Sequence, residues 1–287
     1  MKIVVAGGSG FLGEPLVRRL LARGDDVAVL TRNASHVRAG RPIEWQGPWK
    51  AEVAAADAVI NLAGENIGEG RWTEERKRRL IASRLDATNA IVTTMQGGTL
   101  INASAIGYYG PRGDEVLDEN APRGEGFLAE LVEKWEKAAQ QAPPSVRLAI
   151  LRFGVVLDKS GGALAKMLLP FRLGVGGPIG NGQQWMSWVD REDVLRAIEW
   201  TLDHPSARGV YNITAPEPVR NRDFTRALGR ALHRPAFMPV PAFALRLLFG
   251  EMADEALLSG QRVTPGRVEG EGFRFEKRTL DESLRGL

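Results

Sequence analysis

The chain has 287 residues, of which 44% are hydrophobic and 25% are charged, values typical of a folded protein with one large or two small domains. It contains no cysteine, which excludes disulfides, thiolate metal sites and a cysteine nucleophile. The formal net charge is +3, but no basic tail or dense basic block is present, so we expect no nucleic-acid partner. The three histidines share no metal-binding spacing, and no metal is predicted.

The N-terminal sequence begins directly on an apolar strand pattern rather than on a signal peptide. No apolar run approaches the roughly 18 residues of a membrane-spanning helix. We therefore expect a cytoplasmic protein without a membrane partner, acting on a small molecule.

The first thirteen residues carry the strongest functional pattern. An apolar run at residues 2–6 predicts a buried strand, and residues 14–23 predict a helix. Between them, glycines at 7, 10 and 13 allow a tight turn, close approach of a pyrophosphate and close packing of the helix. We predict a dinucleotide site at Gly7, Ser9, Gly10, Phe11, Leu12 and Gly13; the alternative is a plain glycine-rich turn.

The end of the second predicted strand, at residues 26–32, bears on the choice of cofactor. NAD-binding folds usually carry an acidic residue there, whereas this chain has Thr31, Arg32 and Asn33. A guanidinium can hold a 2′-phosphate through paired hydrogen bonds, so the sequence favours NADP over NAD. The alternative is that Arg32 only stacks on adenine.

Further candidate cofactor contacts lie at the ends of later strands. Residues 57–64 predict a strand ending in Leu62, Ala63 and Gly64, small enough for a flat cofactor to lie against the backbone. Thr73 is a predicted N-cap of a long helix that ends near residue 95 and contains Arg84, whose partner is a phosphate or an ordinary salt bridge.

A strand at residues 99–104 ends at Ala103 and Ser104, and a loop with Tyr108 and Tyr109 follows. The Ser104 hydroxyl and the two tyrosine phenols at this edge are candidate catalytic groups. The alternative is structural: the serine caps the strand end and the tyrosines pack in the loop. A strand at 147–157 would bring Phe153, Gly154 and Val155 to the far end of the cofactor. Strands alternating with helices in this way predict an α/β protein with a Rossmann-type doubly wound parallel sheet.

The composition changes after residue 157. A glycine-rich loop leads to a weakly alternating stretch with Trp185, Ser187 and Trp188, which we interpret as a substrate wall or as simple packing. We expect residues 1–157, joined by 188–215, to form the dinucleotide-binding domain. Residues 158–187 and 216–287 would form a smaller C-terminal α+β substrate domain.

These residues resemble a short-chain dehydrogenase/reductase of the extended type. The glycine loop, the stretch at 61–64 and the segment 188–194 match that class. More narrowly, residues 104–110, 174–188 and 239–252 are similar to an atypical branch, the "epimerase family", which is NAD-dependent epimerase/dehydratase-like. The likeness covers nearly the whole chain. The resemblance makes a homodimer one of the expected oligomeric states, but no residue in the sequence decides between monomer and dimer.

One departure from the superfamily is serious. Its Tyr-x-x-x-Lys pair exchanges the substrate proton and holds the ribose, but the corresponding helix here contains no Tyr, and its first Lys is Lys134. If Phe127 takes the place of the Tyr, Leu131 takes the place of the Lys. Two hypotheses follow. The first is an NADP-dependent oxidoreductase, or an epimerase with a transient keto intermediate, in which Ser104 binds a carbonyl and Tyr108 or Tyr109 replaces the missing acid. The second is a catalytically weak, cofactor-bound regulatory or interaction protein, since some relatives carry a cell-division label.

Overall fold

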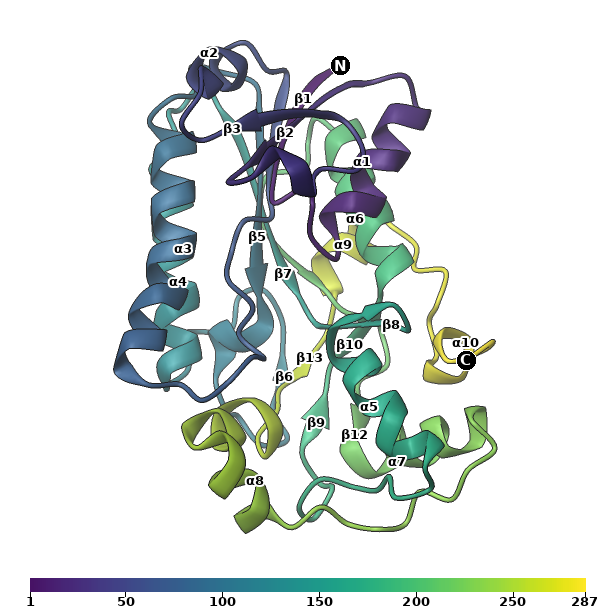
Figure 1. Cartoon of the computed structure of the whole chain (residues 1–287). Coiled ribbons are helices and arrows are strands. Elements are labelled where there is room, and N and C mark those ends of the chain that lie inside the picture. Colours follow the sequence, from purple (N-terminus) through teal and green to yellow (C-terminus); the bar gives the residue numbers. More distant parts are fainter.

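The computed structural model describes residues 1–287, and its centre is a sheet of seven strands (Figure 1). The strands lie in the order β3-β2-β1-β4-β5-β7-β11, and every neighbouring pair is parallel. Their bounds are β1 (Lys2–Ala6), β2 (Asp26–Thr31), β3 (Arg41–Glu44), β4 (Ala58–Asn61), β5 (Thr99–Ala105), β7 (Arg147–Phe153) and β11 (Gly209–Ile213). Their carboxyl ends therefore meet at one edge, where such sheets bind ligands. The predicted α/β doubly wound parallel sheet is confirmed.

Strand β1 shows why the apolar run at the N-terminus has no polar alternation. Ile3 and Val5 point into one core and Val4 and Ala6 into another, on opposite faces of the sheet. A parallel strand covered by helices on both faces needs apolar residues at every position.

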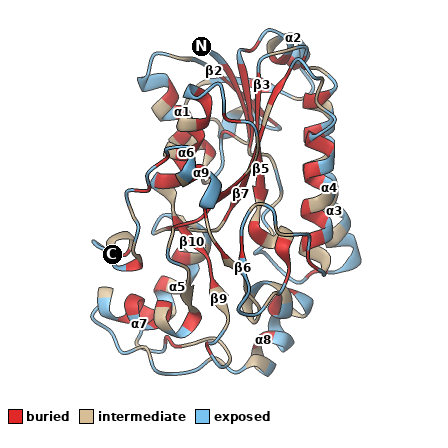
Figure 2. Cartoon of the chain, turned by 180° about the vertical axis from the view of Figure 1, so that it is seen from behind, coloured by how far each residue is buried: buried red, intermediate tan, exposed pale blue.

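Helices cover both faces of the sheet, as Figures 1 and 2 show from opposite sides. On one side lie α1 (Gly13–Ala22), α6 (Arg191–Asp203) and α9 (Gly266–Gly270), and on the other α3 (Glu74–Val92) and α4 (Phe127–Ala139), with α2 (Trp49–Ala54) near the edge strand β3. The predicted N-cap Thr73 is confirmed, because its side chain accepts the Arg76 N–H. Asp190 caps α6 in the same way through the Glu192 N–H.

A smaller region lies beyond the carboxyl edge of the sheet. It contains three two-stranded pairs, β8 (Val155–Asp158) with β10 (Trp188–Asp190), β9 (Trp185–Met186) with β12 (Val219–Arg220), and β6 (Val116–Leu117) with β13 (Arg262–Val263). Its helices are α5 (Gly162–Arg172), α7 (Asn221–Ala231), α8 (Ala242–Phe249) and α10 (Leu280–Ser283). Two 3-10 helices, η1 (Ala34–His36) and η2 (Ile106–Tyr109), and one π-helix, η3 (Ala253–Leu257), complete the list. The strand predicted at 147–157 is divided at Gly154 into β7 and β8.

The C-terminal segment differs from the predicted division into domains. Val268, Phe273 and Phe275 pack in the same buried cluster as β1 and α1, and α9 packs on β11. Residues 266–275 thus lie with the sheet rather than with the smaller region. The sequence could not show this, because an apolar residue in a short punctuated tail does not reveal which core it joins.

The longest helix, α3, is strongly charged. None of the helices combines the length and the apolar character that crossing a membrane requires.

Candidate functional site

The loop between β1 and α1 depends on its glycines. Gly7 has a φ of 79°, which favours glycine, and a Cβ at Gly13 would lie 2.2 Å from the Gly7 carbonyl oxygen. Ser9 and Gly10 are exposed, and Leu12, the N-cap of α1, supplies no side-chain acceptor. Within the first turn of α1, the Glu14 N–H donates to the Gly10 carbonyl at 3.0 Å and Pro15 has no N–H, so the amides left for an anion are those of Phe11, Leu12 and Gly13. This cradle fits the pyrophosphate of a dinucleotide.

The residues after β4 lie directly against this loop. A Cβ at Gly7 would come within 2.8 Å of the Leu62 carbonyl oxygen and 3.0 Å of the Ala63 nitrogen. The structure therefore brings together the two predicted parts of the site, residues 7–13 and 62–64, at the carboxyl ends of neighbouring strands β1 and β4.

Arg84 holds the backbone next to this site. Its guanidinium donates to the carbonyl oxygens of Leu80 at 3.0 Å and Glu65 at 3.1 Å, and no carboxylate forms a salt bridge with it. It packs so closely on Gly64 that a Cβ there would lie 3.1 Å from the Arg84 Cζ. Burial lowers the pKa of Arg84 to about 10, and its buried Nε has no hydrogen-bond partner. Its contact with the cofactor stays a prediction.

The turn after β2 leaves one cation free. Thr31 and Asn33 hold the turn, because the Thr31 hydroxyl donates to the Asn33 carbonyl at 3.1 Å and the Asn33 side chain accepts the Ser35 N–H at 2.9 Å. Arg32 between them is exposed and forms no hydrogen bond or ion pair through its guanidinium. Of the three residues predicted here, Arg32 is the one available to a ligand.

Phe11 and Gly154 connect the cofactor loop to the smaller region. The Phe11 ring fills the space beside Gly161, where a Cβ would lie 2.6 Å from the ring, and the Arg191 guanidinium lies 5.4 Å from its centroid. A Cβ at Gly154 would lie 2.6 Å from the Ser187 carbonyl oxygen. The remaining predicted cofactor contacts lie at the ends of β5 and β7 and the start of β8: Ala103, Phe153 and Val155.

A buried polar network crosses the carboxyl ends of β5, β7 and β11. Arg152 forms a bidentate pair with Glu136, with both N–O distances at 2.7 Å, and each side chain is 4% exposed. The Ser104 hydroxyl donates to Glu136 at 2.5 Å. Arg152 also donates to the Tyr109 hydroxyl at 2.9 Å, which itself donates to the Asn212 side-chain oxygen at 2.7 Å. Ser104 and Tyr109 are thus brought together, but their hydroxyls are engaged by the protein itself.

The electrostatics of this network favour a structural role for Tyr109. Burial raises the pKa of Tyr109 to about 12, although Arg152 opposes the shift. Burial would lower the pKa of Arg152, but the hydrogen bonds and charge of Glu136 outweigh it and the pKa ends above its usual value. Arg152 is therefore a permanent buried cation, balanced by Glu136.

Tyr108 differs from its neighbour. Its ring centroid lies 3.5 Å from the Arg152 Cζ and 5.4 Å from the Tyr109 ring, and its side chain is half-buried. Its hydroxyl makes no hydrogen bond within the chain, whereas the hydroxyls of Ser104 and Tyr109 both do. Of the three predicted catalytic residues, Tyr108 alone offers an unengaged hydroxyl.

Phe127 and Leu131, the expected counterparts of the missing Tyr-x-x-x-Lys pair, lie in an apolar corner. Leu131 is buried in a cluster with Trp72, and Phe127 packs beside them with its ring centroid 5.2 Å from Trp72. The backbone N–H groups of Phe127 and Leu128 donate to Glu255 at 2.7 and 2.9 Å. This corner therefore offers a hydrophobic wall.

The predicted substrate wall divides in two. Ser187 and Trp188 are buried in the core; the Ser187 hydroxyl accepts the Val263 N–H at 2.8 Å, and the Trp188 Nε1 donates to the Glu217 carbonyl at 3.0 Å. This geometry gives their predicted contact with substrate no support.

Trp185 is partly exposed. Its Nε1 donates to Asp114 at 2.7 Å, and the guanidinium groups of Arg220 and Arg262 lie 4.1 and 4.6 Å from its ring centroid. Of the three predicted wall residues, Trp185 alone keeps a surface that a substrate could contact.

Parallel strands in this order, with a glycine loop between β1 and α1 whose last amides have no acceptor in the chain, define a Rossmann-type α/β fold. Residues 3–214 match the model of the NAD dependent epimerase/dehydratase family, and residues 240–287 match a domain of unknown function, DUF1731. The chain belongs to the NAD dependent epimerase/dehydratase family and, within it, to the SDR39U1-like epimerase family proteins with this C-terminal domain.

Relatives match over most or nearly all of their length. The chain is 40% identical to the chloroplastic SDR39U1 homologue of Arabidopsis thaliana, covering 100% of this chain and 86% of the relative. It is 37% identical to the epimerase family protein YfhF of Bacillus subtilis, covering 100% and 98%. The crystal structure of the human epimerase family protein SDR39U1 with NADPH is 35% identical, with a TM-score of 0.90 over 99% of this chain and 98% of that chain.

Sequence reasoning missed Glu136, Arg152, Asn212 and Glu255. A charged residue after the apolar run 148–151 of this strand was the one available signal for Arg152. The other three are ordinary polar residues whose partners lie far away in the chain, so no local pattern identifies them.

Proposed function

We propose that the protein is an NADP(H)-dependent oxidoreductase acting on a small carbonyl or alcohol, or an epimerase that passes through a keto intermediate. The observation that carries this proposal is the unengaged hydroxyl of Tyr108. The Tyr108 ring lies against Arg152, near the carboxyl end of β7, at the same sheet edge as the glycine loop after β1. Family membership and the NADPH in the human relative support the cofactor.

The glycine loop would hold the pyrophosphate on the amides of Phe11, Leu12 and Gly13, and Arg32 would hold the 2′-phosphate. When bound, the nicotinamide supplies a hydride to a carbonyl carbon or takes one from an alcohol. The small residues at 62–64 would let the cofactor lie flat against the ends of the strands.

Tyr108 would give a proton to the carbonyl oxygen, or take it from the alcohol. The buried Glu136–Arg152 pair fixes the guanidinium, and the guanidinium holds the Tyr108 ring by a cation–π contact. The same cation stabilises negative charge on the phenol oxygen when its proton leaves. The apolar wall at Phe127 and Leu131 would exclude water without exchanging a proton.

The two tyrosines make a matched test. Tyr108→Phe and Tyr109→Phe each remove one hydroxyl, and purified proteins would be assayed with NADPH and a panel of aldehydes and ketones. We expect Tyr108→Phe to lower kcat by about 10²–10⁴-fold, because general acid catalysis contributes that much. Tyr109→Phe should mainly lower thermal stability. Equal activity of wild type and Tyr108→Phe would remove Tyr108 from the mechanism.

Arg32 provides the test of the cofactor. Arg32→Ala should weaken NADP binding about 10–100-fold, because a charge-assisted hydrogen bond contributes about 1.5–3 kcal/mol, and should leave NAD binding unchanged. Arg38→Ala is the control, since this side chain is nearby in sequence and 77% exposed. Isothermal titration calorimetry measures all affinities. A parallel loss of NAD affinity would contradict recognition of the 2′-phosphate.

The apolar residues at the Tyr-x-x-x-Lys positions favour a second function, a cofactor-bound regulatory or interaction protein. Tight NADPH binding without turnover of any carbonyl in the panel would support it. Capture of one partner protein by the NADP-loaded form, but not by the empty form, would then establish it.

A further inference from the structure

The smaller region exposes an unusual amount of large hydrophobic surface. Eight of the chain's eleven exposed large hydrophobic side chains lie between residues 169 and 248. On α8, Phe243, Leu247 and Leu248 are between 62% and 73% exposed, and on α5, Leu169 and Leu173 are 65% and 68% exposed. Contiguous apolar surface of this kind marks a place where something binds.

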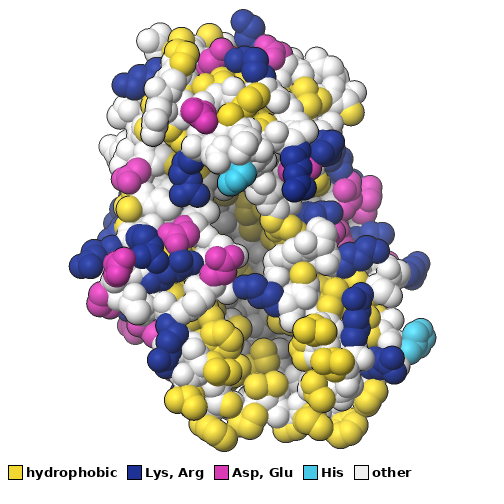
Figure 3. Space-filling model, viewed as in Figure 1, with side chains coloured by type: hydrophobic (Ala, Val, Ile, Leu, Met, Phe, Trp, Pro, Cys, Tyr) yellow, Lys and Arg dark blue, Asp and Glu magenta, His cyan; other side chains and the backbone are white.

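These side chains belong to one continuous surface. The loop that follows α5 pairs with the arm that precedes α8, since the Gly180 N–H donates to the Val240 carbonyl and the Val240 N–H donates to the Pro178 carbonyl, both at 2.9 Å. The other three exposed hydrophobic side chains of this region lie on these two segments, Val175 on the loop after α5 and Phe237 and Met238 on the arm before α8. Figure 3 shows hydrophobic side chains gathered over the lower part of the face, on both sides of a central hollow.

The apolar surface continues inward to the candidate site. Phe249, at the end of α8, packs on the same cluster as Phe127 and Tyr108. The loop 64–72 lies between the two helices, because Lys166 of α5 donates to the Gly68 carbonyl at 2.6 Å and Arg71 donates to the Leu247 carbonyl at 2.8 Å. The loop and the two helices thus lie next to one another, and apolar side chains continue inward from Phe249 through Phe127 to Tyr108.

We infer that the substrate is an amphiphile with a carbonyl or alcohol head at Tyr108 and an extended apolar body lying between α5 and α8. This inference rests on the proposed function and names its substrate class. Burial of these apolar side chains against an apolar ligand is favourable, because both lose contact with water. At the mouth, Lys166 and Arg71 are bound to backbone carbonyls, whereas Arg262 beside the Trp185 ring forms no ion pair. The exposed apolar side chains of α5 and α8 favour an apolar body, and a comparison with UDP-glucose tests it against a charged one.

The test measures binding without turnover. NADPH-loaded protein would be titrated with straight-chain 1-alkanols of four to ten carbons, which cannot be oxidised by a reduced cofactor. We expect affinity to rise about fourfold for each added methylene, because a buried methylene contributes about 0.8 kcal/mol. Leu169→Ser and Leu247→Ser should flatten this dependence. Leu21→Ser, on α1 and 40% exposed, is the control that should leave it unchanged. All three positions are exposed, so the variants should fold.

The opposite results are equally clear. Affinity independent of chain length, or tighter binding of UDP-glucose than of decanol, would overturn the inference. So would an equal effect of all three variants. Sedimentation with phosphatidylglycerol vesicles without alkanol binding would assign the surface to a membrane, and a dimer lost in Leu247→Ser would assign it to a second copy. Titration with NADPH alone tests the proposed function separately, and the alkanol series is repeated with cofactor-free protein so that it can be read even if NADPH does not bind.

Discussion

At the scale of single residues, the pair formed by Glu136 and Arg152 is the strongest electrostatic feature of the site. Glu136→Gln would leave a buried guanidinium without its counter-charge, and breaking such a pair costs about 3–5 kcal/mol. Glu52→Gln is the matched control, because Glu52 holds Arg41 with the same bidentate geometry on the surface, where loss costs about 1 kcal/mol or less. Urea unfolding measures both, and equal losses would show that burial does not set the cost.

The same residues show how far sequence reasoning reaches at this scale. Ser104 and Tyr109 could be placed at the carboxyl edge because their strand and loop follow a local pattern. Their partners could not, since Glu136 and Asn212 lie 32 and 103 residues farther along the chain. The pattern gives the position of a hydroxyl, whereas only the packed structure decides whether that hydroxyl is free.

At the scale of elements, some helices are capped by residues next to them in the sequence and one is capped by a residue far away in the chain. The caps of α3 and α6 were predictable, because Thr73 and Asp190 act within three residues of themselves. The cap of α4 was not, because Gly126 has no side chain and Glu255 replaces it from 128 residues away. The family's C-terminal domain therefore completes the first turn of a helix in the dinucleotide-binding domain.

Removing that remote cap should loosen the start of α4. Glu255→Ala leaves the N–H groups of Phe127 and Leu128 without an acceptor, and we expect a loss of about 1–2 kcal/mol. Hydrogen exchange should show the largest change at residues 127–130. Asp254→Ala is the control, since Asp254 is next to Glu255 in the sequence but pairs with Arg246 on the surface. Unchanged protection in Glu255→Ala would mean that water caps the helix equally well.

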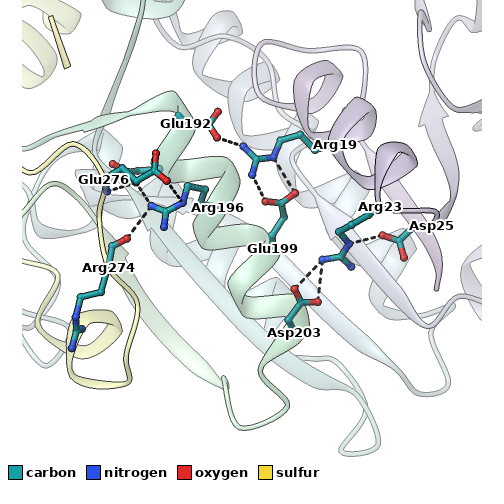
Figure 4. A network of polar contacts seen from close by, with 10 residues as sticks. Arg19, Arg23, Asp25, Glu192, Arg196, Glu199, Asp203, Arg274 and Glu276 are labelled. Atoms are coloured by element: carbon teal, nitrogen blue, oxygen red, sulfur yellow. Dashed lines mark hydrogen bonds and ion pairs between the residues drawn. The ribbon is translucent and has the colours of Figure 1, made fainter. Parts of the chain in front are cut away.

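At the scale of the whole molecule, a polar network ties the N-terminal helix to the chain's later segments, as Figure 4 shows. Arg19 of α1 binds Glu192 and Glu199 of α6, and Arg23 binds Asp203. Farther along α6, Arg196 pairs with Glu276 in the C-terminal segment. Three segments from distant parts of the sequence thus share one face of the sheet, and Arg196 also donates to the Arg274 carbonyl at 2.9 Å, within the segment 266–275 that packs on this face.

Asp25 links this network to pH. Burial alone would raise its pKa, but hydrogen bonds from the N-terminal ammonium and Arg23 outweigh burial, so the pKa lies below its usual value. The folded state then binds fewer protons than the unfolded state. The resulting stability is fully present above the unfolded pKa of about 3.9 and is lost as the pH falls through the folded pKa.

Asp25→Asn removes this dependence. The variant should be less stable than wild type at pH 7, because the neutral amide forms weaker hydrogen bonds with the two cations. Its stability should also fall less steeply between about pH 5 and pH 2, since one proton-linked group has been removed. Urea unfolding at a series of pH values measures both effects. If wild type and variant lose stability in parallel over that range, then Asp25 does not contribute to acid sensitivity and other carboxylates must account for it.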